Sequence, residues 1–186
     1  MVSQFCSPHK VRLFSDLQYT FPEGIHAVGR LDSHSEGLLI LTTNKKITRL
    51  LFESEVPHKR AYLVQVKKIV SEETLQKLRT GITIRVKGGG DYVTTPCDIE
   101  IIPDPTIYLA KFHIKHEFAP TTWLLMSLTE GKFHQVRKMV AAVNHQCKRL
   151  IRVSIEDLAL GDLVPGGVKE LEEETFFRLL RLNEPI

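Results

Sequence analysis

The sequence predicts an α+β fold in which a large, mainly antiparallel mixed sheet is flanked by helices, and three observations support this prediction. Short segments alternate apolar and polar residues with the period of a strand, most clearly at 61–67. Residues 71–80 carry the start and stop signals of a helix. Strands and helices are mixed without the regular rhythm of a parallel α/β sheet. We therefore expect a single domain over residues 1–186, with two sheet halves.

The first elements are short. The first 20 residues alternate weakly, and residues 22–24 form a turn. The apolar run 37–41 is bounded by turn residues on both sides, which is typical of a buried strand. Apolar residues at 47, 50 and 51 follow at helical spacing, so we expect a short amphipathic helix at 45–53.

The middle of the chain carries the clearest patterns. Tyr62, Val64 and Val66 share one face of the strand predicted at 61–67. Ser71 is the expected N-cap of the helix at 71–80, and Gly81 follows where a left-handed residue commonly ends a helix. Further strands are expected at 82–86, 97–102, 107–115 and 122–129.

The composition is that of an ordinary globular protein, with 42% hydrophobic and 25% charged residues. No apolar run approaches the roughly 20 residues needed to cross a membrane, and no secretion signal opens the chain. Cys6, Cys97 and Cys147 form no C-x-x-C pair, which favours reduced thiols in a cytoplasm over a disulfide or zinc framework. His113 and His116 lack matched partners, so we expect no metal site.

The formal net charge is only +3, but its distribution is uneven. No acidic residue occurs between Glu130 and Glu156 or between Glu36 and Glu53. The basic residues in the first of these windows are Lys132, Arg137, Lys138, Lys148, Arg149 and Arg152. Two interpretations are open: a surface that binds phosphates, or an ordinary solvated face.

Asp32 lies in a short polar turn directly before the predicted buried strand. A rigid element could aim its carboxylate there, or Asp32 could be a turn residue that accepts a backbone N–H. Downstream, apolar residues at 136, 139, 140 and 143 define a helix face, with Arg137 at its border and Lys138 pointing away. Arg137 could reach into a half-buried site or lie along the edge of the core.

Four separated motifs resemble RNA pseudouridine synthases of the RsuA type and occur in that family's order. GRLDSHSEGLLILT at 29–42 is similar to the catalytic motif G-R-L-D-x-x-(S/T)-x-G-L-L-(I/L)-L-T. KRAYLV at 59–64 resembles the segment that supplies the active-site tyrosine. EGKFHQVRKM at 130–139 resembles the third motif, E-G-(K/R)-x-x-Q-V-R-(K/R)-M. RLIR at 149–152 and LALGDL at 158–163 are similar to the closing strands and turn.

The resemblance implies a pseudouridine-synthase catalytic domain with a central RNA-binding cleft. Since isomerising uridine transfers no electrons and no external group, no cofactor is expected. The resemblance places Asp32 at C1′ of the uridine, through a sugar adduct or a glycal route, and gives Asp32 an ion pair with Arg137. Tyr62 would stack on the uracil, although its pattern alone fits a core residue. Arg30 would fill the gap left by a flipped-out uridine, or form a salt bridge in the turn.

PTTWL at 120–124 resembles the RluE-like branch, which acts on large-subunit ribosomal RNA and has no S4 RNA-binding domain. We therefore expect a cytoplasmic monomer that acts at one position of 23S ribosomal RNA, without a membrane partner. The family's opening N-K-P-x-G-V segment is missing, so the chain is either trimmed or lacks part of an edge strand. The expected RNA contacts are Arg30, Lys132, Lys138, Lys148, Arg149 and Arg152.

Two other functions agree with parts of the sequence. A non-catalytic RNA-binding module explains the basic segments but not Asp32, since a carboxylate facing phosphates weakens binding. A hydrolase with Asp32 as nucleophile lacks an evident second acid or base in a matched motif. Tritium release from C5 of labelled uridine in RNA distinguishes all three functions.

Overall fold

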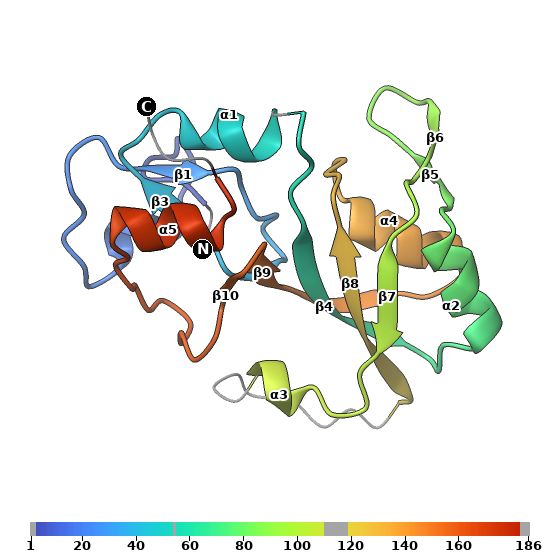
Figure 1. Ribbon diagram of the computed structural model, residues 1–186. Helices are drawn as coiled ribbons and strands as arrows, with labels where there is room; N and C mark the ends of the chain where they lie inside the picture. The colour runs from blue at the N-terminus through green and yellow to red at the C-terminus, as the bar shows by residue number, and fades with distance from the viewer. Residues whose placement is uncertain (1–2, 54, 110–118, 183–186) are drawn as a thin grey trace.

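The computed structural model describes residues 3–53, 55–109 and 119–182, and a mixed sheet of six strands forms its centre (Figure 1). This main sheet has the strand order β10-β9-β4-β8-β7, and β2 pairs with β9. Its strands are β2 (Glu36–Gly37), β4 (Arg60–Lys67), β7 (Asp98–Ile101), β8 (Thr121–Leu128), β9 (Cys147–Ile155) and β10 (Leu158–Ala159). All pairs are antiparallel except β2–β9. The predicted α+β fold with a mainly antiparallel mixed sheet is confirmed.

Two hydrophobic cores lie against the main sheet, and β4 contributes to both. Leu63 belongs to one core, whereas Val64 and Val66 belong to the other, as the period of a strand requires. The core that contains Leu63 is covered by β1 (His26–Val28), β3 (Ile40–Thr42), α1 (Ile47–Phe52) and α5 (Glu173–Leu179) (Figure 1). The core that contains Val64 and Val66 is covered by α2 (Glu72–Arg79), β5 (Thr83–Arg85), β6 (Asp91–Val93) and α4 (Gln135–Ala142). A 3-10 helix (Phe14–Asp16) and α3 (Thr106–Leu109) complete the described elements.

Local sequence sets both ends of α2, as predicted. The Thr74 N–H donates to Ser71 Oγ at 3.2 Å, a cap that contributes about 1 kcal/mol to helix stability. Gly81 follows the helix with a φ of 100°, a left-handed conformation that glycine adopts without strain. The strand predictions at 61–67, 82–86, 97–102 and 122–129 and the helix at 45–53 are confirmed, with small shifts at their ends.

Two sequence predictions are corrected. The run 37–41 is not one strand: β2 pairs with β9 in the main sheet, and β3 pairs with β1, so the chain crosses between sheets at residues 38–39. The segment predicted as a strand at 107–115 begins as helix α3, because Asp104 Oδ1 accepts the Thr106 N–H at 2.9 Å and Pro105 suits a helix start. Residues 110–115 of that prediction lie outside the described residues.

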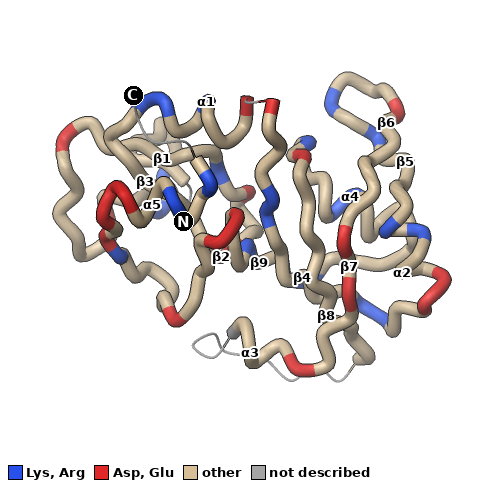
Figure 2. Tube along the Cα trace, in the orientation of Figure 1, with Lys and Arg blue, Asp and Glu red and all other residues tan. Residues whose placement is uncertain are grey.

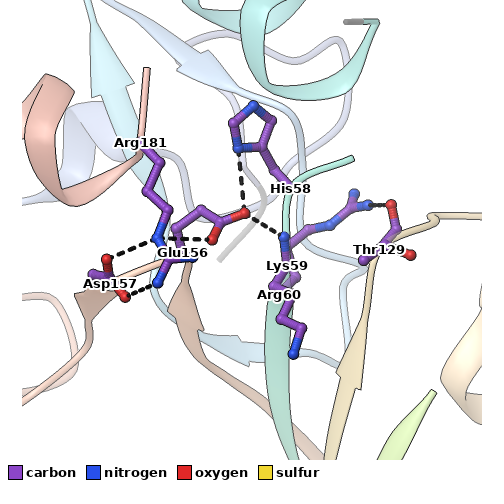
Figure 3. Close-up of polar contacts among 7 residues, drawn as sticks. All are labelled: His58, Lys59, Arg60, Thr129, Glu156, Asp157 and Arg181. Atoms are coloured by element: carbon purple, nitrogen blue, oxygen red, sulfur yellow. Dashed lines mark hydrogen bonds and ion pairs between the residues drawn. The ribbon is translucent and has the colours of Figure 1, made fainter. Parts of the chain in front are cut away.

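A polar cluster fastens the end of the described chain to the main sheet (Figure 3). His58 and Glu156 are 5% and 7% exposed, and Nδ1 of His58 lies 3.3 Å from Oε1 of Glu156. The Lys59 N–H donates to the same oxygen at 2.6 Å. Arg181, just after α5, donates to both carboxylate oxygens of Asp157 at 2.9 and 2.8 Å. The His58 and Lys59 contacts, with Nε of Arg181 3.6 Å from Oε2, satisfy the buried carboxylate of Glu156, which would otherwise destabilise the fold.

Candidate active site

The loop that carries Asp32 runs from β1 to β2, and a glycine with positive φ stands at each end. Gly29 has a φ of 70°, and a Cβ there would lie 2.9 Å from the ring of Phe52. Gly37 has a φ of 103°, and a Cβ there would lie 2.3 Å from the carbonyl oxygen of Arg152. Only glycine fits both positions, since other residues rarely adopt this conformation and have no room. The loop therefore enters and leaves its turn along a defined path.

The Asp32 side chain is partly exposed, and the basic side chain beside it is that of His134. Nε2 of His134 lies 3.4 Å from Oδ1 of Asp32, and the two side chains are 40% and 33% exposed. The contact is an ion pair only when the imidazole is protonated. His134 directly precedes α4 and has a φ of 56° and a ψ of 29°, a region that non-glycine residues seldom adopt. Sequence reasoning missed His134, whose only signal is its place in the third motif.

Arg137 reaches the same loop but does not pair with Asp32. Its Nη2 donates to the carbonyl oxygen of His34 at 2.5 Å. Among the described residues, His134 is the only basic side chain at ion-pair distance from Asp32. The expected Arg137–Asp32 ion pair is therefore corrected: the guanidinium ends at the backbone two residues further along the loop. Arg137 is half-buried on α4, which agrees with its predicted place at the border of the apolar face.

Arg152 lies underneath the loop, facing Tyr62. It is 3% exposed, and its Nε donates to the carbonyl oxygen of Leu38 at 2.8 Å. Tyr62 of β4 stands opposite Arg152 of β9 in the sheet register. Burial lowers the pKa of the Arg152 guanidinium, and its interaction with Tyr62 opposes that shift. Arg152, expected as a phosphate contact, is thus buried, and we interpret it as a residue that connects the strand of Tyr62 to the segment that follows Asp32.

Arg149 also holds the segment after Asp32. Its Nε and Nη2 donate to the two carboxylate oxygens of Glu36, at 3.0 and 2.7 Å. The tube of β2 accordingly carries an acidic residue close to β9 (Figure 2). This side-chain pair joins β2 to β9. A backbone hydrogen bond adds to it, since the Leu38 N–H donates to the Arg152 carbonyl oxygen at 2.8 Å. We therefore interpret Arg149 as support for the loop rather than as a phosphate contact.

The other expected RNA contacts lie at the surface. Lys132 and Lys148 are exposed, and Lys138 is half-buried with its Nζ 5.4 Å from the centre of the Phe133 ring. Arg30 is exposed and forms no hydrogen bond or ion pair with any residue in the described ranges. The alternative that Arg30 makes a salt bridge in the turn therefore finds no support.

The loop before α4 is held by Glu130, a residue that the sequence analysis did not assign. Oε1 of Glu130 accepts from Gln135 Nε2 at 2.5 Å and from the Thr95 N–H at 3.0 Å. Tyr92 of the β5–β6 hairpin donates its hydroxyl to Glu130, and this hydrogen bond raises the pKa of Tyr92. Oε1 of Gln135 in turn accepts the Lys132 N–H at 2.8 Å. This network fixes the short loop that presents His134 to Asp32.

The histidines considered as metal ligands, His113 and His116, lie outside the described residues. In the part of the chain that the structure describes, no group of three or more His, Cys, Asp or Glu side chains is arranged to hold a metal ion. No helix among the described residues is long and apolar enough to cross a membrane.

Solved structures share this fold. A solved pseudouridylate synthase superposes with a TM-score of 0.68 at 24% identity, covering 87% of this chain and 63% of that one. A solved Cbf5-Nop10-Gar1 complex matches with a TM-score of 0.51 at 13% identity, over 74% of this chain and 42% of that one. At these identities the likeness shows a shared fold.

Sequence comparison shows the family. The family model for RNA pseudouridylate synthase matches residues 4–142. The ribosomal large subunit pseudouridine synthase E of Vibrio parahaemolyticus is 35% identical over 172 residues, which cover 92% of this chain and 69% of that protein. The enzyme of the same name from Xanthomonas axonopodis pv. citri is 33% identical, over 89% of this chain and 85% of that protein. The chain belongs to the RNA pseudouridylate synthases, a family of enzymes, as its motifs predicted.

Proposed function

We propose that this enzyme isomerises one uridine of large-subunit (23S) ribosomal RNA to pseudouridine, and that Asp32 acts at C1′ of the flipped-out nucleotide. The substrate class rests on the relatives, which are named for the ribosomal large subunit. The assignment of Asp32 rests on one observation above all. Its side chain is 33% exposed, so the carboxylate is accessible, while its loop is confined at both ends by Gly29 and Gly37. A reactive group needs this combination of access and fixed placement.

The reaction conserves every atom. The C1′–N1 bond breaks, the uracil turns, and C5 joins C1′; the proton lost from C5 balances the one gained at N1. Positive charge develops on the sugar, and a carboxylate can stabilise it or bond to it directly. Asp32 would serve either an adduct at C1′ or removal of the C2′ proton to give a glycal.

Tyr62 and Arg137 would act beside Asp32 in different ways. Tyr62 is half-buried on β4 next to Arg152, so its ring could stack on the uracil and its hydroxyl could carry a proton at the sugar. Arg137 would support the loop through the His34 carbonyl instead of pairing with Asp32. Lys132, Lys138, Lys148 and Arg30 would contact the RNA. We further propose a cytoplasmic monomer.

Tritium release tests the proposal. Large-subunit ribosomal RNA is transcribed with uridine tritiated at C5 and incubated with the wild type, with Asp32→Asn and with Asp32→Glu. Isomerisation releases the tritium into water, and Asp32→Asn should lower the rate at least 1000-fold while RNA affinity stays within about threefold. Asn is close to isosteric with Asp and removes only the charge and the nucleophile. Residual turnover within tenfold of the wild type would refute the assignment.

The rival functions give different results in the same assay. A hydrolase would release free uracil from the RNA, and a binding module would release nothing. Mapping pseudouridines in total RNA from cells with and without the gene then tests the substrate. We expect loss of one site in large-subunit RNA and unchanged transfer RNA; many lost sites, or lost transfer RNA sites, would contradict the proposed specificity.

A further inference from the structure

Phe133 is an aromatic side chain with no place in the cores. Its side chain is 58% exposed. Every other Phe, Tyr or Trp among the described residues is buried or half-buried. A ring in water costs free energy relative to a buried ring, at roughly 25 cal/mol for each Å² left exposed. Single exposed apolar residues are common, but this ring stands in a short loop beside the candidate active site, where an unpaired RNA base could stack on it.

The ring is oriented by its neighbours and lies close to Asp32. It stacks on the imidazole of His134, with ring centres 3.9 Å apart and planes inclined by 17°. His134 in turn lies 3.4 Å from the Asp32 carboxylate, so one imidazole separates Phe133 from the proposed nucleophile. The network of Glu130 and Gln135 fixes the loop on which both rings stand.

The charges around Phe133 suit an anionic partner. Lys138 holds its Nζ over the Phe133 ring, 5.4 Å from the ring centre, and Lys132 precedes Phe133 with its own Nζ over the ring of Tyr92 at 4.7 Å. No acidic residue occurs in the sequence between Glu130 and Glu156. An exposed aromatic ring with a lysine ammonium over it suits a nucleobase and its phosphates: a base that stacks on the ring leaves the ammonium free to contact a phosphate. Unpaired bases commonly stack on aromatic side chains of RNA-binding proteins. A protein or membrane partner would call for a broader apolar area than this single ring.

We propose that Phe133, stacked on His134, binds the unpaired base next to the target uridine in the RNA. This inference rests on the proposed function and adds a binding site to it. When the uridine flips toward Asp32, the neighbouring base loses a stacking partner, and Phe133 supplies a new one. The binding of that neighbour then brings the uridine to the carboxylate. Phe133 would thus contribute to the choice of the site without touching the reacting atoms.

Three variants at Phe133 test the proposal: Phe133→Ala removes the ring, Phe133→Leu keeps apolar bulk, and Phe133→Tyr keeps an aromatic face. The probe is a transcribed fragment of large-subunit ribosomal RNA that contains the mapped uridine. We expect Phe133→Ala to raise KM about tenfold, the usual effect of losing one stacked base, with a smaller change in kcat. Phe133→Tyr should stay within about twofold of the wild type and Phe133→Leu should behave like Phe133→Ala. Ile69→Ala, which changes another exposed apolar residue, should alter neither constant.

The same RNA with an abasic nucleotide on either side of the uridine separates stacking from other effects. On the RNA that lacks the stacked base, wild type and Phe133→Ala should bind equally. The proposal would be overturned if the difference in affinity between wild type and Phe133→Ala were as large on both abasic RNAs as on the intact RNA. It would also be overturned if Phe133→Leu had the KM and kcat of the wild type. Binding is also measured with Asp32→Asn in place of the active enzyme. If Asp32→Asn keeps its activity, the proposed function fails; if it is inactive and Phe133→Ala binds like the wild type, only the stacking site fails.

Discussion

Replacing Gly37 by alanine should displace the Asp32 loop, and the structure offers a matched control for this change. Gly37 and Gly88 have nearly the same positive φ, 103° and 101°. A Cβ on Gly88 would meet nothing within 4 Å, whereas a Cβ on Gly37 would lie 2.3 and 2.7 Å from the carbonyl oxygen and the nitrogen of Arg152. The two substitutions therefore share the backbone strain, and only Gly37→Ala adds a collision with backbone atoms.

The difference in stability follows from the contacts that the collision breaks. The strain itself should cost about 1–3 kcal/mol in both variants. In Gly37→Ala, β2 must also move away from β9, which breaks the hydrogen bond from the Leu38 N–H to the Arg152 carbonyl and the one from Arg152 Nε to the Leu38 carbonyl, both 2.8 Å long. A neutral and a charge-assisted hydrogen bond together contribute about 3 kcal/mol. For a chain of this length, that extra loss lowers Tm by about 10 °C.

Urea unfolding monitored by the fluorescence of the buried Trp123 measures this difference, and tritium release measures activity. Gly88→Ala should retain wild-type turnover. Gly37→Ala should lose about 100-fold even well below its Tm, since a displacement of about 1 Å at a reacting group has an effect of that order. Equal unfolding midpoints for the two variants, or wild-type turnover in Gly37→Ala, would refute the reasoning.

Three further predictions concern single side chains. Arg137→Lys should lower kcat at least tenfold, because a lysine is shorter and cannot hold the His34 carbonyl in the same way, whereas Lys138→Arg should change it less than threefold; equal effects in the tritium assay would mean that the contact to the loop has no role. Arg30→Ala should slow conversion of a folded RNA more than that of an RNA whose target uridine is already unpaired, and equal slowing of both would exclude Arg30 as the residue that replaces the flipped base. Burial raises the pKa of Cys97 to about 11, so iodoacetamide at pH 8 should alkylate it far more slowly than the exposed Cys6, with a rate that rises with pH; peptide mass spectrometry over time checks this, and similar rates at pH 8 would contradict it.

The sequence by itself determined the elements whose causes are local. Ser71 and Gly81 bound α2 because a cap and a left-handed glycine act within one turn of the helix. The alternation of Tyr62, Val64 and Val66 predicted the face of β4 because side chains on a strand point to opposite sides in turn. The motifs around Asp32 and Arg137 predicted the family for the same reason: each is a short contiguous string.

Tertiary structure decided everything that depends on residues far apart in the chain. The sequence predicted Arg149 and Arg152 to be basic surface residues. In the structure, Arg149 donates to Glu36 and Arg152 donates to the Leu38 carbonyl, partners more than a hundred positions away in the chain. Pairing with β9 likewise divides the apolar run 37–41, since Glu36 and Gly37 join the main sheet while β3 pairs with β1. No local pattern reveals such contacts, because the burial of a charge depends on the partner that satisfies it. The neighbour of Asp32 was decided in the same way: the turn before α4 brings His134 to the carboxylate, and Arg137, one helical turn later, ends at the His34 carbonyl.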